Sequence, residues 1–116
     1  MRFLIVLNDP PYGTERSYNG LRLAGSLATK QEQAEVDVFL MGDAVACAKA
    51  GQTTPNGYYN IERMLKPVLR RGRVLLCGSC MDARGLKEAE MVEGATRSSL
   101  DELTQLSVSA DKVAVF

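Results

Sequence analysis

The stretch RFLIVLNDPPYGTERS, residues 2–17, contains the first indication of the fold. Residues 2–7 form a continuous apolar run, which is typical of a strand buried on both faces of a sheet. The turn-forming letters NDPPYGT follow at once and predict a loop. Thr14 is placed to cap a helix from Glu15 to about Lys30. The apolar positions of that helix are Leu21, Ala24, Leu27 and Ala28.

A second unit of the same kind follows. Residues 36–41, VDVFLM, predict another buried strand. Gly42 and Asp43 then start a short, alanine-rich helix that runs to Ala50. Residues 51–60, GQTTPNGYYN, have the turn-rich composition of a surface loop.

A clear helical pattern follows this loop and leads to a third strand. Pro67 is expected to kink or break the helix, and Gly72 to end it. Residues 73–76, RVLL, predict a buried strand that delivers Cys77, and residues 78–84 predict a turn or helix. The apolar residues of the helix, at positions i, i+3, i+4, i+7 and i+8, are Ile61, Met64, Leu65, Val68 and Leu69.

The carboxyl-terminal third is expected to contain a short strand at residues 91–92, a helix and a closing strand at residues 112–116, KVAVF. Ser98 or Ser99 is expected to cap the helix. Alternating strands and helices predict one α/β domain over residues 1–116, a three-layer α/β/α sandwich with a mostly parallel sheet of about five strands. The apolar residues of the last helix are Leu100, Leu103 and Leu106.

Composition and charge exclude several classes of protein. The 116 residues include 14 basic and 14 acidic side chains, so the chain lacks the net charge that nucleic-acid binders and acidic-membrane binders use. The basic cluster at residues 70–73 is expected to be a solvated face at a helix end. The opening apolar run is too short for a signal peptide, and no stretch is long enough to span a membrane. These features predict a cytoplasmic protein.

Three cysteines and no histidine limit the chemistry further. A structural zinc site needs four Cys or His ligands, so no metal site is expected. The absence of histidine also excludes Cys-His and Ser-His-Asp catalysis. An odd number of cysteines in a reducing compartment argues against a disulfide framework. Cys47 lies in the alanine-rich helix and is interpreted as a small buried hydrophobic residue.

Cys77 and Cys80 are different, because they follow a buried strand in the sequence CGSC. Ligands and reactive groups of parallel sheets lie at the carboxyl ends of the strands. Small residues at Gly78 and Ser79 would let backbone N–H groups approach the Cys77 sulfur, and Arg84 would add a cation, which together favour a thiolate. Two alternatives stay open, namely buried strand-end packing and a CxxC thiol-disulfide oxidoreductase. The chain lacks tryptophan, which normally precedes a thioredoxin-type CxxC.

Several segments together resemble the DsrE/DsrF-like family of small sulfur-relay proteins. They are the opening MRFLIV, the loop DPPYGTERS, Cys77 with Arg84 and Gly85 seven residues on, and the closing ADKVAVF. The resemblance implies an α/β subunit that carries sulfur as a persulfide on Cys77 without a cofactor, in a homo-oligomer that is a trimer or hexamer. Cys80 has no counterpart in TusD-type members of the family.

These observations predict a sulfur-transfer protein whose partners are sulfur donor and acceptor proteins. Cys77 is the expected nucleophile, and Cys80 is either a resolving thiol or idle. Tyr58 and Tyr59 of the surface loop are expected to help form a subunit interface. The alternatives are the CxxC oxidoreductase and a non-catalytic assembly subunit of a DsrE-type oligomer. The residues expected to line the pocket are Tyr12, Gly13, Thr14, Gly78 and Arg84.

Overall fold

A computed structural model describes residues 1–116 and contains a five-stranded sheet in the order β4-β3-β2-β1-β5. All neighbouring strands pair in parallel, so the expected "mostly parallel" sheet is parallel throughout. The elements in chain order are β1 (Arg2–Leu7), α1 (Arg16–Lys30), β2 (Glu35–Leu40), the 3₁₀ helix η1 (Gly42–Ala48), α2 (Ile61–Met64), α3 (Lys66–Arg71), β3 (Arg73–Cys77), α4 (Gly78–Ala83), the 3₁₀ helix η2 (Glu88–Glu90), β4 (Thr96–Ser98), α5 (Leu100–Ser109) and β5 (Lys112–Val115).

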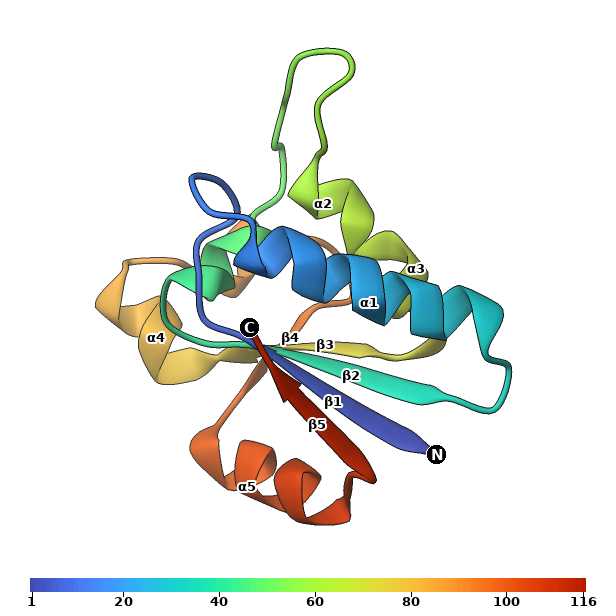
Figure 1. Cartoon of the computed structure of the whole chain (residues 1–116). Helices are drawn as coiled ribbons and strands as arrows, with labels where there is room; N and C mark the ends of the chain where they lie inside the picture. The colour runs from blue at the N-terminus through green and yellow to red at the C-terminus, as the bar shows by residue number, and fades with distance from the viewer.

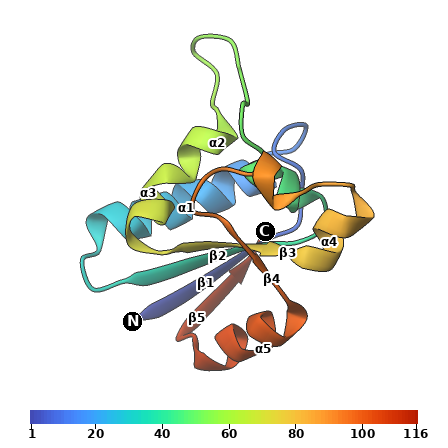
Figure 2. The same ribbon diagram turned by 180° about the vertical axis from the view of Figure 1, so that it is seen from behind.

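The helices cover both faces of the sheet, as the alternating pattern predicts. Figure 1 shows α1, α2 and α3 on one face, α5 on the other, and α4 beyond the end of β3. Figure 2 shows from behind that β4 runs beside β3 at the edge of the sheet. The three-layer α/β/α prediction is therefore confirmed. The longest helix has 15 residues, and none of the helices is long and apolar enough to cross a membrane.

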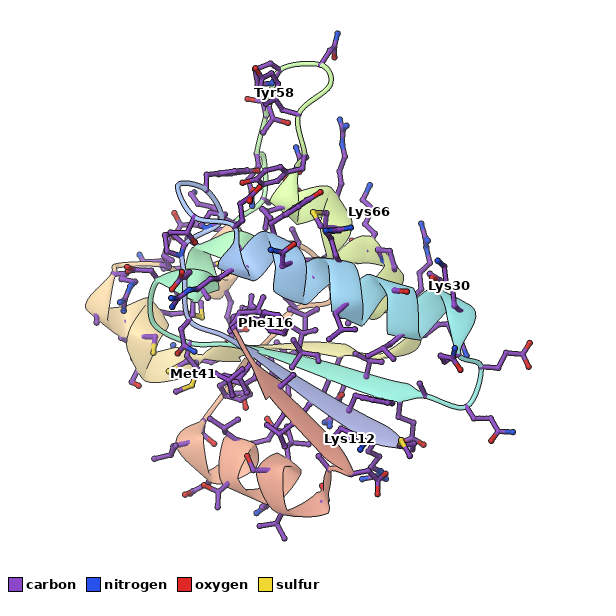
Figure 3. The ribbon with its side chains drawn as sticks, in the orientation of Figure 1. Lys30, Met41, Tyr58, Lys66, Lys112 and Phe116 are labelled. Carbon is purple, nitrogen blue, oxygen red and sulfur yellow. The ribbon has the colours of Figure 1, made fainter.

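The contact between α1 and the sheet depends on a glycine. A Cβ on Gly20 would lie 2.3 Å from Leu7 Cδ2 and 3.1 Å from the Phe116 ring, so only a glycine lets the helix sit this close. Phe116 lies between α1 and the sheet (Figure 3). Its N–H donates to the Val6 carbonyl oxygen at 2.8 Å, and its carbonyl accepts from Asn8 N at 3.0 Å. The final residue thus closes the core above β1.

The predicted Thr14 cap is wrong. Helix α1 begins at Arg16, its N-cap is Glu15, and no side chain caps it. Thr14 lies one residue too early, and its hydroxyl donates to Asp9 Oδ2 at 2.9 Å within the preceding loop. The local hydrogen bond of a turn has replaced the expected cap.

Two other helix boundaries agree with the sequence. The helix that was expected to break near Pro67 is divided into α2 and α3 at Leu65, and Gly72 ends α3. Proline is tolerated there because it lies in the first turn of α3. Ser99 caps α5 by accepting a hydrogen bond from Glu102 N at 3.3 Å, which confirms one of the two predicted caps.

The short strand expected at residues 91–92 is wrong. Met91 forms an isolated antiparallel bridge with Lys49 and is buried, so its apolar character reflects packing. The fourth strand is Thr96–Ser98, which pairs with β3 and is mostly exposed. A polar strand at the edge of a sheet carries no apolar run for a sequence pattern to detect.

The surface loop at residues 51–60 separates the two tyrosines that were expected to act together. Tyr59 packs inside the subunit, with its ring centroid 4.3 Å from Tyr18 and 5.8 Å from Tyr12. Tyr58 is 72% exposed and lies near the tip of the protruding loop (Figure 3). Of these two tyrosines, only Tyr58 therefore has a side chain exposed enough to contact another molecule.

A pair of glycine substitutions tests the packing of α1 and α3. A Cβ on Gly72 would lie 1.9 Å from the carbonyl oxygen of Val36 in β2, which is backbone and cannot move aside. We expect Gly72→Ala to lower the free energy of unfolding by about 1–3 kcal/mol, because the added methyl overpacks the core. Urea denaturation monitored by circular dichroism measures this change.

Gly25→Ala in the middle of α1 is the matched control. Its Cβ would meet nothing closer than Pro67 Cβ at 3.9 Å. We expect a gain of about 0.5–1 kcal/mol, since alanine loses less backbone entropy in a helix than glycine does. Equal losses in both variants would contradict the packing described here.

Candidate functional site

The carboxyl ends of β1, β2 and β3 meet at one edge of the sheet. A Cβ on Gly42, which follows β2, would lie 3.6 Å from the carbonyl oxygen of Asn8 after β1 and 3.8 Å from Arg84 Nη2 after α4. Gly42 has φ +54°, in the left-handed region, where a side chain would be strained. The segments after the three strands therefore lie against one another, and Cys77 ends the third of these strands.

Cys77 is positioned as a hydrogen-bond acceptor at the start of α4. Its side chain is the N-cap of that helix, and Sγ accepts from the backbone N–H of Cys80 at 3.3 Å. Sγ also lies 3.5 Å from Ser79 Oγ, which donates when the sulfur is ionised. Burial raises the pKa of the Cys77 thiol, but hydrogen bonds from the side chains and backbone of Cys80 and Ser79 outweigh it and leave the pKa lowered. The arrangement favours a thiolate on Cys77.

Cys80 holds the proton of the pair. Burial raises its pKa, and so does the hydrogen bond that its thiol makes with Cys77. The backbone of Gly42 and the charge of Arg84 act in the opposite direction without reversing the shift. Cys80 is half-buried, and no disulfide is present. The two pKa shifts have opposite directions, so Cys77 ionises more readily than Cys80.

Cys47 is a buried structural residue, as the sequence predicts. Its side chain is fully buried, and Sγ donates to the carbonyl oxygen of Asp9 at 3.8 Å. Burial raises its pKa to about 12, so it stays protonated at neutral pH. Cys47 provides an internal reference for an unreactive thiol.

Arg84 lies beside Cys80, although the sequence placed it with Cys77. Its Nη1 donates to the Cys80 carbonyl oxygen at 3.1 Å, and its Nε donates to Asp43 Oδ1 at 2.9 Å. Its positive charge lowers the pKa of Cys80. Arg84 therefore joins α4 to η1 and acts on the second thiol of the pair.

The predicted lining residues of the first loop make their contacts elsewhere. The Tyr12 hydroxyl donates to Gln52 Oε1 at 2.6 Å and accepts from Ile61 N at 3.1 Å, which ties the first loop to the base of the surface loop. Thr14 bonds to Asp9, and Gly13 has φ +101° in an open turn. No hydrogen bond joins these three residues to Cys77 or Cys80.

Sequence reasoning missed two acidic residues and one basic residue around the pair. Asp43 holds Arg84, while Asp82 holds Arg97 through two hydrogen bonds of 2.9 and 2.7 Å. Arg97 lies against Gly78, where an added Cβ would be 2.7 Å from Arg97 Nε. The letters around Arg97 gave no signal, because it comes from β4, the strand that the sequence did not reveal.

The cysteine pair lies outside the cavities of the subunit. The largest cavity, about 500 Å³, lies at the opposite end of the strands, where β1, β2 and β3 begin, and is lined mainly by charged residues. Two smaller cavities, about 290 and 250 Å³, lie beside α1 and beside α2 and α3. No group of three or more His, Cys, Asp or Glu side chains could hold a metal ion. The residues around the largest cavity are Arg2, Glu35, Val36, Asp37, Arg71, Gly72 and Arg73.

Comparisons with known proteins cover the whole chain. The model of the DsrE/DsrF-like family matches residues 1–116. Protein YchN of Escherichia coli is 39% identical over 116 residues, which are 99% of this chain and 98% of YchN. An uncharacterized protein of Methanocaldococcus jannaschii is 37% identical over 117 residues, covering 100% of both chains.

Solved structures show the same architecture. The crystal structure of the E. coli ychN protein has a TM-score of 0.92 at 39% identity, and the match covers 99% of this chain and 98% of that one. A protein of unknown function from Methanobacterium thermoautotrophicum has a TM-score of 0.79 at 12% identity, with 99% and 98% covered. The second likeness shows the fold alone.

The first prediction for the site concerns its reactivity. Because alkylation needs the thiolate, its rate rises with pH and levels off above the pKa of the attacking thiol. The lowered pKa of Cys77 should bring this plateau to a lower pH than for an exposed cysteine. We expect iodoacetamide at neutral pH to label Cys77 first and Cys47 only after unfolding, as located by peptide mass spectrometry. Equal, slow labelling of all three cysteines in the folded protein would contradict the assignment.

Proposed function

The chain belongs to the DsrE/DsrF-like family, and we propose that it is a sulfur-transfer protein. In this proposal the Cys77 thiolate accepts a sulfane sulfur atom, holds it as a persulfide, and passes it to the thiol of a partner protein. Sulfur relay is consistent with the family, and the persulfide on Cys77 is our extension of it to this chain.

One observation carries the proposal, namely the hydrogen bonds at the Cys77 sulfur. Sγ accepts from the backbone N–H of Cys80 at 3.3 Å and lies 3.5 Å from the hydroxyl of Ser79. Hydrogen bonds from Cys80 and Ser79 lower the pKa of Cys77 and so raise the fraction of it that is thiolate.

The transfer step needs no change of oxidation state overall. The Cys77 thiolate attacks the outer sulfur of a donor persulfide, R–S–SH, forming the Cys77 S–S bond while the donor S–S bond breaks. The donor leaves as R–S⁻, and the sulfane sulfur remains as Cys77–S–SH. A partner thiolate then repeats the exchange on the outer sulfur. Access, alignment and a low pKa are enough for both steps, so the proposal involves no cofactor or metal.

The position of the pair favours proteins as sulfur donor and acceptor: Cys77 is 7% exposed, and Cys80 is half-buried at the start of α4. The cysteines line none of the three cavities, so a small molecule would find little enclosure there. A partner protein can instead bring its own thiol to the surface beside α4. We place the protein in the cytoplasm in this proposal, because a reducing compartment keeps the three thiols free.

A second function is favoured by the contact between the two thiols. The thiol of Cys80 lies within hydrogen-bond reach of the Cys77 sulfur, so it is close enough to act as a resolving thiol. Attack of Cys80 on the inner sulfur of a Cys77 persulfide would form the Cys77–Cys80 disulfide and release hydrogen sulfide. In that reaction the two cysteines are oxidised and the sulfane sulfur is reduced. The chain would then work as a thiol-disulfide oxidoreductase.

Mutation of each cysteine separates the two functions. We expect the parent protein, incubated with a persulfide donor, to gain ~32 Da on Cys77, whereas closing a disulfide would remove ~2 Da. Cys77→Ser should abolish both changes, since serine supplies no thiolate. Cys80→Ser should retain the added sulfur and lose it more slowly, because the resolving thiol is gone. Intact-mass measurement with peptide mapping follows all three proteins.

Cys47→Ser serves as the control. Because Cys47 is fully buried and bonds to the Asp9 carbonyl oxygen, this variant should load sulfur as the parent does. A Cys80→Ser protein that takes up no sulfur while the parent does would contradict the single-cysteine relay and favour the dithiol function. Absence of any mass gain in the parent would leave the third possibility, a non-catalytic assembly subunit.

We also propose that the chain acts as a homo-oligomer, a trimer or a hexamer. Its surface exposes large apolar side chains in the loop, at Tyr58, on α5, at Leu100 and Val108, and along the β5 edge, where Val113 and Val115 are 48% and 65% exposed. β5 pairs only with β1, so one side of its backbone is unpaired. Exposed apolar groups beside an open strand edge are typical of an interface.

The oligomer predicts a mass above that of one subunit. We expect light scattering at micromolar concentration to give about three or six times the subunit mass of 12.6 kDa. Tyr58→Ser should weaken assembly, while Tyr18→Phe, which keeps the packing of an internal ring, should not. A mass near 12.6 kDa for the parent protein would contradict this proposal.

A further inference from the structure

Arg97 lies next to the reactive cysteine although it is distant in sequence. It is the middle residue of β4, which pairs in parallel with β3, in a register that places Leu76 opposite Arg97 and Cys77 opposite Ser98. The side chain of Arg97 is 41% exposed and extends from the edge strand toward α4. Pairing with β3 therefore brings a cation against Gly78, the residue that follows Cys77.

Asp82 fixes the direction of the Arg97 guanidinium. Both oxygens of the Asp82 carboxylate accept hydrogen bonds from Arg97, from Nη1 at 2.9 Å and from Nη2 at 2.7 Å. This two-point contact holds the planar group more firmly than a single bond would. The Nε–H of Arg97 makes no hydrogen bond within the subunit, so this donor is available to a ligand.

Gly78 provides the surface on which the guanidinium rests. A Cβ on Gly78 would lie 2.7, 2.8 and 3.0 Å from Arg97 Nε, Cζ and Nη2. Three such similar distances mean that the planar group lies across the glycine and not end-on to it. Gly78 directly follows Cys77, so the absence of a side chain lets the cation lie against the backbone next to the reactive sulfur.

The electrostatics agree with this placement. The pKa of Arg97 is raised, chiefly by the hydrogen bonds to Asp82, and the negative charge of Cys77 contributes in the same direction. The lowered pKa of Cys77 itself comes from the hydrogen bonds of Cys80 and Ser79. Arg84, by contrast, acts on Cys80.

We propose that Arg97, held across Gly78 by Asp82, is the cation of the Cys77 site and gives it a preference for anionic reaction partners. Its unused Nε–H would face the negative group of the incoming molecule. For sulfur transfer, which rests on the function proposed above, the preferred donors are then persulfides, R–S–SH, whose R group carries a negative charge.

Two alkylating reagents of different charge test this preference without any sulfur donor. Iodoacetate is an anion and iodoacetamide is neutral, and both react with the same thiolate, so the ratio of their rates cancels the thiol pKa. All variants are made in the Cys80→Ser protein, so that Cys77 is the one accessible thiol. We expect Arg97→Gln to lower the iodoacetate-to-iodoacetamide ratio about threefold to tenfold at low ionic strength, with a smaller change at high salt.

Three further variants define the cause. Asp82→Asn removes a negative charge and keeps a hydrogen-bond acceptor for Arg97, so it should raise the ratio. Arg97→Lys keeps the charge without the two-point contact and should give an intermediate ratio. Arg70→Gln removes an equal charge from an exposed residue at the end of α3 and should leave the ratio unchanged.

A ratio in Arg97→Gln that matches that of Arg70→Gln would overturn the proposal, and so would an Arg97→Lys protein as low as Arg97→Gln. Circular dichroism of each variant checks that it is folded. The test is independent of the sulfur-transfer function. A protein that shows the charge preference but never gains sulfur would refute that function and leave the assignment of Arg97 intact. A protein that gains sulfur but shows no charge preference would refute the assignment of Arg97 and leave the function intact.

Discussion

Parallel pairing of β1, β2 and β3 is the constraint on which the site depends. Leu7 pairs with Leu40, and Leu40 pairs with Leu76, so three fully buried leucines form one row across the sheet. The residues that follow this row leave their strands at the same level, and Cys77 is one of them. A shift of register by one residue would turn the leucines to the opposite face of the sheet. The hydrophobic core therefore fixes the position of the reactive sulfur.

The three cysteines show how the environment alone divides one chemical group into different roles. Cys47 is enclosed by apolar side chains and stays protonated, whereas Cys77 is ringed by hydrogen-bond donors at the end of a strand. Cys80 lies one helical turn beyond Cys77 and supplies two of those donors, its backbone N–H and its thiol. The thiolate is thus produced by backbone geometry and a neighbouring thiol, in a chain that contains no histidine to act as a base.

Local sequence signals were enough to predict the parts of the fold that depend on them. The apolar runs identified β1, β2 and β3, and the position of Cys77 followed from the end of the third run. The polar strand β4 left no such signal, since it lies at the sheet edge and is defined by its pairing with β3. Arg97 was missed for the same reason, because its contact with Gly78 joins residues that only the folded sheet brings together. Arg84 was found by its spacing from Cys77, but spacing along a helix could not tell which of the two sulfurs it approaches.

The surface loop is fastened at its base and free at its tip. At the base, the side-chain amide of Gln52 donates to the carbonyl oxygens of Cys47 and Lys49, and the side-chain amide of Asn60 donates to the carbonyl oxygen of Gln52. At the tip, Gly57 has φ +86° and no atom lies within 4 Å of where its Cβ would be. Extra residues inserted at Gly57 would therefore lengthen the loop without disturbing the thiols. Such a change in loop length would give related chains a route to new binding partners while the surroundings of the cysteine pair stay the same.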